Sequence, residues 1–412
     1  MTGMAKRCRV LCGCLGGVLA VIFLLMLCSG QSGSLSALAE ASEPVPFTAE
    51  YYASPSDRFG VGLNNGITVS LNGNARRVLL SDYDVAALHV AWYSDWGMAQ
   101  DPARPGGVQY AQMVLVRASE YPTNTLELTD TVQANAGALW LIGNEPEAKY
   151  NQGNRTPVEY AQIYHDVYGL IKSADPSAWV AIGGVVEPTP LRLQWLEETL
   201  AAYEDLYGQL MPVDVWNIHA QILQEKAGDW GAEIPAGIEA TTGELFHFSI
   251  QSGYYDNANP VLFRQLVTQF RQWMKDRGLQ DKPLIISEYG VLLPSTYIGY
   301  GRGYGDEAFG HQVLKTFMRE TFEFLVTAKD PELGYPADDY RLVQQWLWYS
   351  LNDRPFGYDP DTGRQYGFNG ALFDHTDPTR MTQFGETFRD YVRVLLGYPR
   401  VLLPLVVNRS SD

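Results

Sequence analysis

The sequence is short of cysteine, and its four cysteines all lie within the first 28 residues. Residues 40–412 therefore contain no thiol, which excludes disulfide bonds and cysteine-ligated metal sites from that part of the chain. Histidine is also scarce, with six residues scattered along the chain and no His-Glu-x-x-His motif. No glycine-rich dinucleotide fingerprint follows the first apolar segment. We therefore expect neither a metal nor an organic cofactor.

Basic residues are outnumbered, with 30 lysines and arginines against 47 aspartates and glutamates, for a net charge of -17. Such a surface repels phosphate backbones, so we do not expect nucleic acid as a partner. A strongly polyanionic substrate is disfavoured for the same reason, unless a local basic patch overrides the net charge.

The first 39 residues differ in composition from the rest. Basic residues at positions 6–9 precede an uncharged apolar run of 19 residues, 10–28, and Ala-Leu-Ala follows at 37–39. This order is typical of a secretory signal peptide, although the run is almost long enough to remain as a membrane anchor. We expect residues 1–39 to be one or the other, with residues 40–56 as a linker. Either alternative predicts an extracellular or cell-surface protein, and the second adds membrane association.

Eight short apolar segments recur along the remaining chain and are expected to be strands. They are residues 59–63, 88–93, 111–116, 138–143, 178–184, 213–219, 283–287 and 344–350. Most are continuous apolar runs, which is typical of parallel strands buried on both faces.

Helix signals lie between several of these segments. Thr156 begins a capping box with proline at the first helical position, and Thr189-Pro190 and Asn259-Pro260 begin two further helices. Apolar stripes predict two more helices, over residues 309–324 and 384–395.

The alternation predicts an α/β protein with a (β/α)8 TIM barrel over residues 57–398. A doubly wound open sheet is the structural alternative. Two connections are long, residues 220–259 after the sixth strand and 291–305 after the seventh, and long loops of this kind are usually functional. Residues 399–412 form an apolar tail.

Two carboxylates follow strands that are distant in the sequence. Asn144 and Glu145 follow the fourth segment in "ALWLIGNEPE", and Glu288 follows the seventh in "PLIISEYG". A lone Asn-Glu-Pro is more typical of a helix start. In a barrel, however, the carboxyl ends of all strands meet on one face, so both carboxylates would share a pocket. Such a pair is the machinery of glycoside hydrolysis.

This pattern resembles the clan-A retaining glycoside hydrolases, whose branches include the cellulase family, the plant-stress-like glycosyl hydrolases and the β-xylosidase-like barrels. The resemblance implies that Glu145 is the acid/base, Glu288 the nucleophile and Asn144 the amide that holds the sugar 2-hydroxyl. It also implies that His219 lines the site and that Trp348 supplies an aromatic floor.

Four further residues are candidates for substrate binding: Trp92 and Asp95 with the second strand, Gln221 after the sixth and Tyr289 after Glu288. The chain also departs from the family pattern. Many members read His-x-Tyr where this chain has His-Ala-Gln at residues 219–221, and the second strand lacks the arginine often found there. Trp348 alternates with Trp346, and either tryptophan could instead fill the core.

The sequence therefore predicts a secreted glycosidase that cleaves a poly- or oligosaccharide by a retaining double displacement. Two alternatives stay open: an inactive barrel that binds carbohydrate at the cell surface, and a transglycosylase with the same carboxylate pair. The sequence carries no signal for the sugar, the linkage or the oligomeric state.

Overall fold

The computed structural model describes residue 52 and residues 54–71, 74–150, 152–246, 255–298, 306–358, 360–361, 363 and 365–398. The chain divides into two compact units, Met1–Glu43 and Pro44–Asp412, and every described residue belongs to the second. The expected leader and the apolar tail lie outside the described residues. Among the helices that are described, none combines the length and apolarity needed to cross a membrane.

Parallel strands form two sheets. The strands are β1 (Phe59–Gly62), β4 (Trp92–Ser94), β5 (Gln109–Tyr110), β6 (Gln112–Val114), β7 (Leu139–Asn144), β8 (Trp179–Gly184), β9 (Trp216–His219), β10 (Leu284–Tyr289) and β11 (Gln345–Trp348). One sheet has the order β5-β4-β1-β11-β10-β9, and the other has the order β6-β7-β8. Two parallel bridges, from Ala181 to Val215 and from Val185 to Ile218, join the segments around β8 and β9.

Each of the eight predicted segments overlaps one of these strands. The second starts later than expected, because Leu88 ends the short helix α1 (Val85–Leu88) and His89 adopts a left-handed φ of 54°. Two antiparallel hairpins were not predicted, β2 (Thr68–Leu71) with β3 (Asn74–Arg77) and β12 (Gly357–Tyr358) with β13 (Gln365–Tyr366).

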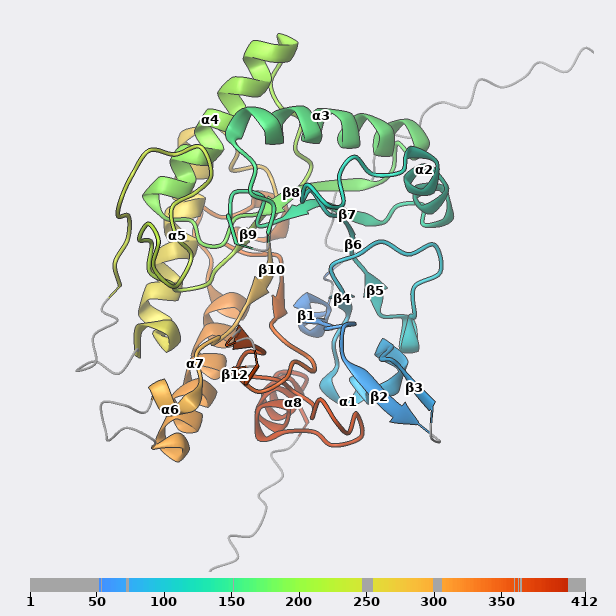
Figure 1. Cartoon of the computed structure of the whole chain (residues 1–412), viewed down its shortest axis with the longest axis vertical. Helices are drawn as coiled ribbons and strands as arrows, with labels where there is room; N and C mark the ends of the chain where they lie inside the picture. The colour runs from blue at the N-terminus through green and yellow to red at the C-terminus, as the bar shows by residue number, and fades with distance from the viewer. Residues whose placement is uncertain are drawn as a thin grey trace, which may run out of the picture. The chain divides into compact units, whose positions relative to one another are not determined.

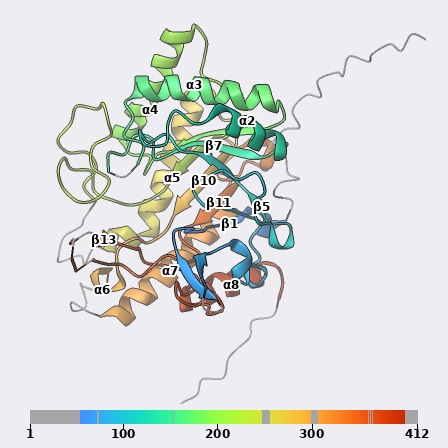
Figure 2. The ribbon, with the colours of Figure 1, turned by 45° about the vertical axis from the view of Figure 1, so that its right-hand side comes forward.

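Helices surround the parallel strands (Figures 1 and 2). The longer ones are α2 (Thr125–Ala134), α3 (Pro157–Ala174), α4 (Pro190–Tyr207), α5 (Pro260–Asp276), α7 (Glu307–Thr327) and α8 (Gln383–Leu395), and α6 (Ser295–Ile298) is short. Short 3-10 helices lie at Pro55–Arg58, Leu80–Asp82, Pro105–Gly107, Tyr255–Ala258 and Pro336–Asp338. The predicted starts of α3, α4 and α5 are confirmed, and the Thr156 side chain accepts from the Glu159 amide in a complete capping box.

Apolar side chains of the parallel strands divide into two clusters according to the strand face they occupy. The inner cluster holds residues from strands of both sheets, and none of its members comes from the long helices. Its members include Trp92, Met113, Leu141, Ala181, Val215, Ile285 and Leu347. The helix-side cluster joins the alternate strand residues, such as Trp140, Trp216, Ile286 and Trp346, to helix residues such as Tyr160, Phe263 and Phe317. Because side chains alternate along a strand, both strand faces are buried.

Candidate active site

Glu145, His219 and Glu288 meet at the carboxyl ends of β7, β9 and β10. One side-chain oxygen or nitrogen from each of the three lies within 4.8 Å of the others. His219 Nδ1 is 2.9 Å from Glu145 Oε1, and all three residues are buried. The tertiary structure therefore brings together three predicted site residues that come from strands far apart in the sequence.

An unusual backbone conformation positions Glu145. Its φ is 41°, in the left-handed region that non-glycine residues rarely adopt, and Gly143, two residues earlier, has a φ of 97°. The Glu145 amide donates to the Gly184 carbonyl at 3.1 Å, which ties the turn to β8. Residues 145–147 form a bend and turn, so the helix start suggested by Asn-Glu-Pro is absent, and the next helix begins at Pro157. Strained residues of this kind concentrate at functional sites.

A β-bulge positions Glu288. Ile218 pairs with Ile286, but the next residue, His219, pairs with Glu288, so β10 carries one extra residue against β9. The same shift appears against β11, where Trp346 and Trp348 pair with Ile286 and Tyr289. An extra residue reverses the facing of the side chains that follow it. The bulge thus places Glu288 beside His219 and turns Tyr289 to the helix side.

Two N–H groups donate to the Glu288 carboxylate. Trp96 Nε1 lies 3.1 Å from Oε2, and Gln221 Nε2 lies 3.3 Å from Oε1. Gln221 was a predicted binding residue, and it lies two positions after His219. Trp96 was missed, although it lies two residues after the carboxyl end of β4. Gly62 makes room for its ring, because a Cβ there would lie 2.6 Å from the indole.

Burial and neighbouring charge shift the ionisation of the trio. Burial raises the pKa of Glu288 to about 7, with His219 opposing the shift and the Glu145 carboxylate adding to it. Burial by itself would lower the pKa of His219, but Glu288 and the hydrogen bond to Glu145 raise it above its ordinary value. The ionisation of Glu288 therefore depends on the charges of both neighbouring groups.

Asn144 and Gln221 each leave a buried acceptor unused. Asn144 Nδ2 donates to Gln152 Oε1 at 2.9 Å. Within the described part of the chain, Asn144 Oδ1 and Gln221 Oε1 have no hydrogen-bond partner. Buried polar atoms are normally paired, so these two oxygens are suited to accept hydrogen bonds from a ligand.

Trp348 and Tyr289 do not join the carboxylates, which corrects their expected roles. Trp348 is fully buried, donates its Nε1–H to the Gly370 carbonyl at 2.9 Å and packs edge-on against Tyr289 and Phe322. Tyr289 is fully buried against Phe263. The bulge and the alternation along β11 turn both rings to the helix side, so they pack the core.

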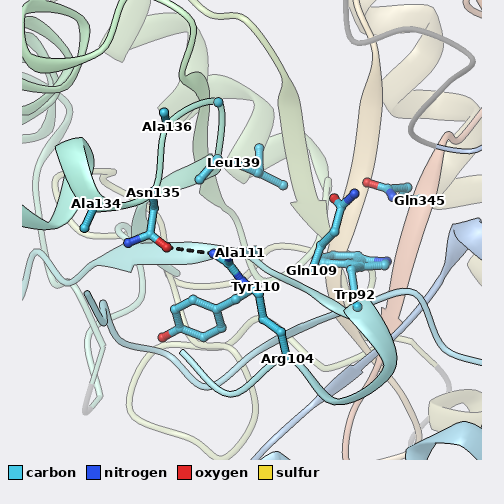
Figure 3. A pocket seen from close by; sticks show the side chains of 13 residues that line it. Trp92, Arg104, Gln109, Tyr110, Ala111, Ala134, Asn135, Ala136, Leu139 and Gln345 are labelled. Carbon is cyan, nitrogen blue, oxygen red and sulfur yellow. Dashed lines mark hydrogen bonds between the residues drawn. The ribbon is translucent and has the colours of Figure 1, made fainter. Parts of the chain in front are cut away.

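Trp92 is also displaced from its expected place. It belongs to the inner cluster, donates to the Arg58 carbonyl at 3.3 Å and lines a cavity of about 350 Å³ together with Gln109 and Gln345 (Figure 3). Trp92 and Gln345 are the first residues of β4 and β11, whereas the trio lies at the carboxyl ends of its strands. Asp95 follows β4, and its carboxylate accepts from the Tyr110 hydroxyl and from Asn65 Nδ2. Asp95 is thus adjacent in sequence to Trp96 without touching the trio.

A fully buried ion cluster lies beside the trio. Arg192 donates to Glu147 Oε1 at 3.0 Å and to Glu225 Oε1, and all three side chains are inaccessible. Glu187, also fully buried, accepts from the Leu223 amide at 3.0 Å. Burial raises the pKa of Glu147 and raises that of Glu187 well above its ordinary value, although Arg192 opposes both shifts. The cluster fixes the turn after β7 to the long loop after β9.

The trio is also the group of acids and histidines that could hold a metal ion within the described residues. Zinc binds nitrogen and oxygen ligands at about 2.0–2.2 Å in a tetrahedron, which places ligand atoms roughly 3.4 Å apart. A spread of up to 4.8 Å would therefore require the three side chains to move closer together around an ion.

A scan against protein-family models finds no match, and a search of curated proteins finds none. Solved structures give weak similarities. An endo-beta-1,3-glucanase of GH128 subgroup II from Sorangium cellulosum is 15% identical with a TM-score of 0.47, covering 81% of this chain and 98% of that chain. A family 39 glycoside hydrolase from Bacteroides cellulosilyticus WH2 is 14% identical with a TM-score of 0.44, covering 80% and 62%.

A third similar structure is a GH128 subgroup VII oligosaccharide-binding protein from Trichoderma gamsii, which is 11% identical with a TM-score of 0.41 and covers 76% of this chain and 91% of that chain. With TM-scores below 0.5, these similarities assign neither an activity nor a substrate to this chain.

Proposed function

We propose that the protein is a glycosidase that cleaves O-glycosidic bonds of a poly- or oligosaccharide with retention of configuration. The observation that carries this proposal is the pair of buried carboxylates, Glu145 and Glu288, whose nearest oxygens lie within 4.8 Å. Retaining enzymes hold their two carboxyl groups about 5–5.5 Å apart, whereas inverting enzymes leave about 6.5–9.5 Å for a water molecule.

The hydrogen bonds around the pair support a division of roles. Two N–H donors, Trp96 and Gln221, face Glu288 and favour its ionised form, which is the form that attacks the anomeric carbon. Glu145 protonates the glycosidic oxygen and later removes a proton from the water that hydrolyses the glycosyl-enzyme. His219 holds the Glu145 carboxyl in place through the 2.9 Å contact.

The proposed architecture is a (β/α)8 barrel with this site at its carboxyl-terminal face. The parallel strand order supports it, because residues 109–114 contribute β5 to one sheet and β6 to the other, and bridges link the β8 and β9 segments. The inner cluster supports it too, because Trp92, Leu141 and Leu347 come from strands spread over both sheets.

The composition of residues 1–39 supports export to the cell surface or the medium, and residues 10–28 would provide a membrane anchor if they are not cleaved. The substrate would then be an extracellular glycan. Buried acceptors on Asn144 and Gln221 would bind its hydroxyl groups.

Hydrolysis of a panel of polysaccharides and aryl glycosides tests the proposal. Glu288→Gln should abolish turnover of every glycoside that the wild type cleaves, and Glu198→Gln, at an exposed position on α4, is the matched control. Proton NMR of the first product should show the configuration of the substrate. Full activity of Glu288→Gln would refute the function, and an inverted product would refute the mechanism.

An inactive carbohydrate-binding barrel is the second candidate. The observation that favours it is Gln221, which contacts Glu288 where related hydrolases use tyrosine. Glycan binding that survives both Glu145→Gln and Glu288→Gln, with no hydrolysis by the wild type across the panel, would support binding alone. Transfer of the glycosyl group to added acceptor sugars, in preference to water, would instead identify a transglycosylase.

A further inference from the structure

A second cavity lies at the carboxyl-terminal end of the strands, as the two carboxylates do. Its walls come from the segments that follow β1 and β11. It has a volume of about 520 Å³. Ile67 and Thr68 line it from the first segment, and Arg354, Tyr366 and His375 line it from the second. Small-molecule sites occupy roughly 300–1,000 Å³, so the cavity can accommodate a monosaccharide unit.

Short contacts connect this cavity to Glu288. Trp96, which donates to Glu288, meets Tyr349 edge-on with ring centroids 5.5 Å apart. The Tyr349 hydroxyl donates to Asp353 Oδ2 at 2.6 Å, and the Arg354 amide donates to Asp353 Oδ1 at 2.7 Å. These contacts link Trp96, which touches Glu288, to residues 353 and 354 at the wall of the cavity.

The cavity has the opposite charge from the protein as a whole. Acidic residues outnumber basic ones by 47 to 30 in the chain, yet the ionisable side chains on the cavity wall are Arg354, His375 and a tyrosine. The flanking acids are engaged elsewhere: Asp353 is buried and bonded to Tyr349, and Asp374 forms an ion pair with Arg380. Arg354 is exposed, and no carboxylate in the described part of the chain pairs with it.

Tyr366 supplies an apolar surface beside Arg354 and His375 on the cavity wall. It pairs with Gly357 across the β12–β13 hairpin and remains 43% exposed. Its ring lies over Gly357, because a Cβ at Gly357 would lie 2.6 Å from the tyrosine hydroxyl. The C–H face of a pyranose packs against such an aromatic surface, which buries apolar area while the sugar substituents point outward.

We propose that this cavity is a subsite for an anionic sugar unit, in which Arg354 binds the negative group and Tyr366 stacks on the pyranose ring. The group is a carboxylate or a sulfate ester, since guanidinium binds both through paired N–H donors. The inference rests on the proposed glycosidase function and specifies its substrate class as a glycan that carries acidic units.

Binding of monosaccharides to the full-length chain tests the subsite without requiring turnover. D-Glucuronate, D-glucose 6-sulfate and D-glucose share the pyranose and differ in the group at C6. Dissociation constants are measured by saturation-transfer NMR for the wild type, Arg354→Gln and Tyr366→Ala. Arg319→Gln is the matched control, because Arg319 is an exposed arginine on α7.

At least one charged sugar should bind the wild type about tenfold more tightly than glucose, as expected for a charge-assisted hydrogen bond at a partly exposed site. The comparison of glucuronate with glucose 6-sulfate identifies which anionic group the subsite prefers. Arg354→Gln should remove the preference for a charged sugar over glucose, and Arg319→Gln should keep it. Tyr366→Ala should weaken the binding of all three sugars.

Equal affinity for all three sugars would overturn the proposal, as would a preference that survives Arg354→Gln. The dissociation constants of sodium acetate and inorganic sulfate are measured as well. If either ion binds as tightly as the charged sugars, the cavity recognises the anionic group alone, and the proposal of a sugar subsite is overturned. Failure of the glycosidase proposal is recognised separately, because it appears as unchanged hydrolysis by Glu288→Gln or as no hydrolysis at all.

Discussion

Trp96 donates its indole N–H to Glu288 across 3.1 Å, although 192 residues separate them in the sequence. The indole cannot ionise and cannot accept a proton, so it can only stabilise a negative charge on this carboxylate. The contact therefore favours the ionised form of Glu288 whatever the pH. Gln221 adds a second donor on the other carboxylate oxygen.

Removal of the indole donor should make Glu288 harder to ionise. We expect Trp96→Phe to lower kcat/KM at pH 7 about tenfold and to move the rising limb of its pH profile to higher pH, because a hydrogen bond to a charged group is lost. Trp230→Phe, at an exposed tryptophan in the loop after β9, is the control. An unchanged pH profile would show that the indole does not act on the ionisation of Glu288.

The activity should rise with pH through about 7. Glu288 must be ionised to attack, and burial together with the Glu145 charge raises its pKa to about 7 in the free protein. Glu145→Gln removes that charge, so its residual activity on an aryl glycoside with a good leaving group should rise at lower pH. The measurement is kcat/KM between pH 4 and 9. If the rising limb of the pH profile lies at the same pH in Glu145→Gln as in the wild type, the Glu145 charge does not affect the ionisation of Glu288.

Ionisation of Glu288 should also destabilise the folded state. Its pKa is about 7 when folded against 4.5 as the ordinary value. Between these values the folded state binds more protons than the unfolded state, so the free energy of unfolding falls as pH rises through this window. The total loss is at most about 3 kcal/mol. Urea denaturation at pH 4.5 and pH 8 should show this loss in the wild type and in Glu198→Gln, and a smaller one in Glu288→Gln.

Arg192 should be essential for stability, because it is the cation in contact with the buried carboxylates Glu147 and Glu225. Arg192→Met leaves those charges without compensation, and we expect a loss of about 3–5 kcal/mol in the free energy of unfolding. Arg319→Met on the surface of α7 should change it little. Comparable urea midpoints for the two variants would refute the structural role of this cluster.

A substitution at Trp348 tests whether this ring packs the core or contacts the substrate. Trp348→Phe removes the hydrogen bond to the Gly370 carbonyl and some core volume, so we expect a loss of about 1–3 kcal/mol in stability. KM for any substrate should stay unchanged, since the ring packs against Tyr289 and Phe322. A large rise in KM with unchanged stability would restore the substrate-binding role.

Much of the fold could be predicted from the sequence, because local chemistry determines it. Thr156 and Pro157 begin α3 through a capping box, and continuous apolar runs mark strands buried on both faces. The proximity of Glu145 and Glu288 followed from strand-end placement, since parallel strands bring their carboxyl ends to one edge. The role of His219 came from the family resemblance, and Gln221 was a candidate because it follows the sixth predicted strand.

The rest depended on how side chains face, which the tertiary structure decides. Ile285 faces the inner cluster. With regular alternation along β10, Glu288 would face the helices and Tyr289 would face the inner cluster. The bulge after Ile286 reverses the direction in which both side chains face. Trp92 and Trp96 are four residues apart in one segment, yet only Trp96 lies beyond the strand end and reaches a carboxylate. The sequence alone determined which strands carry the chemistry. Pairing registers, set by long-range hydrogen bonds and packing, decided which side chains face one another.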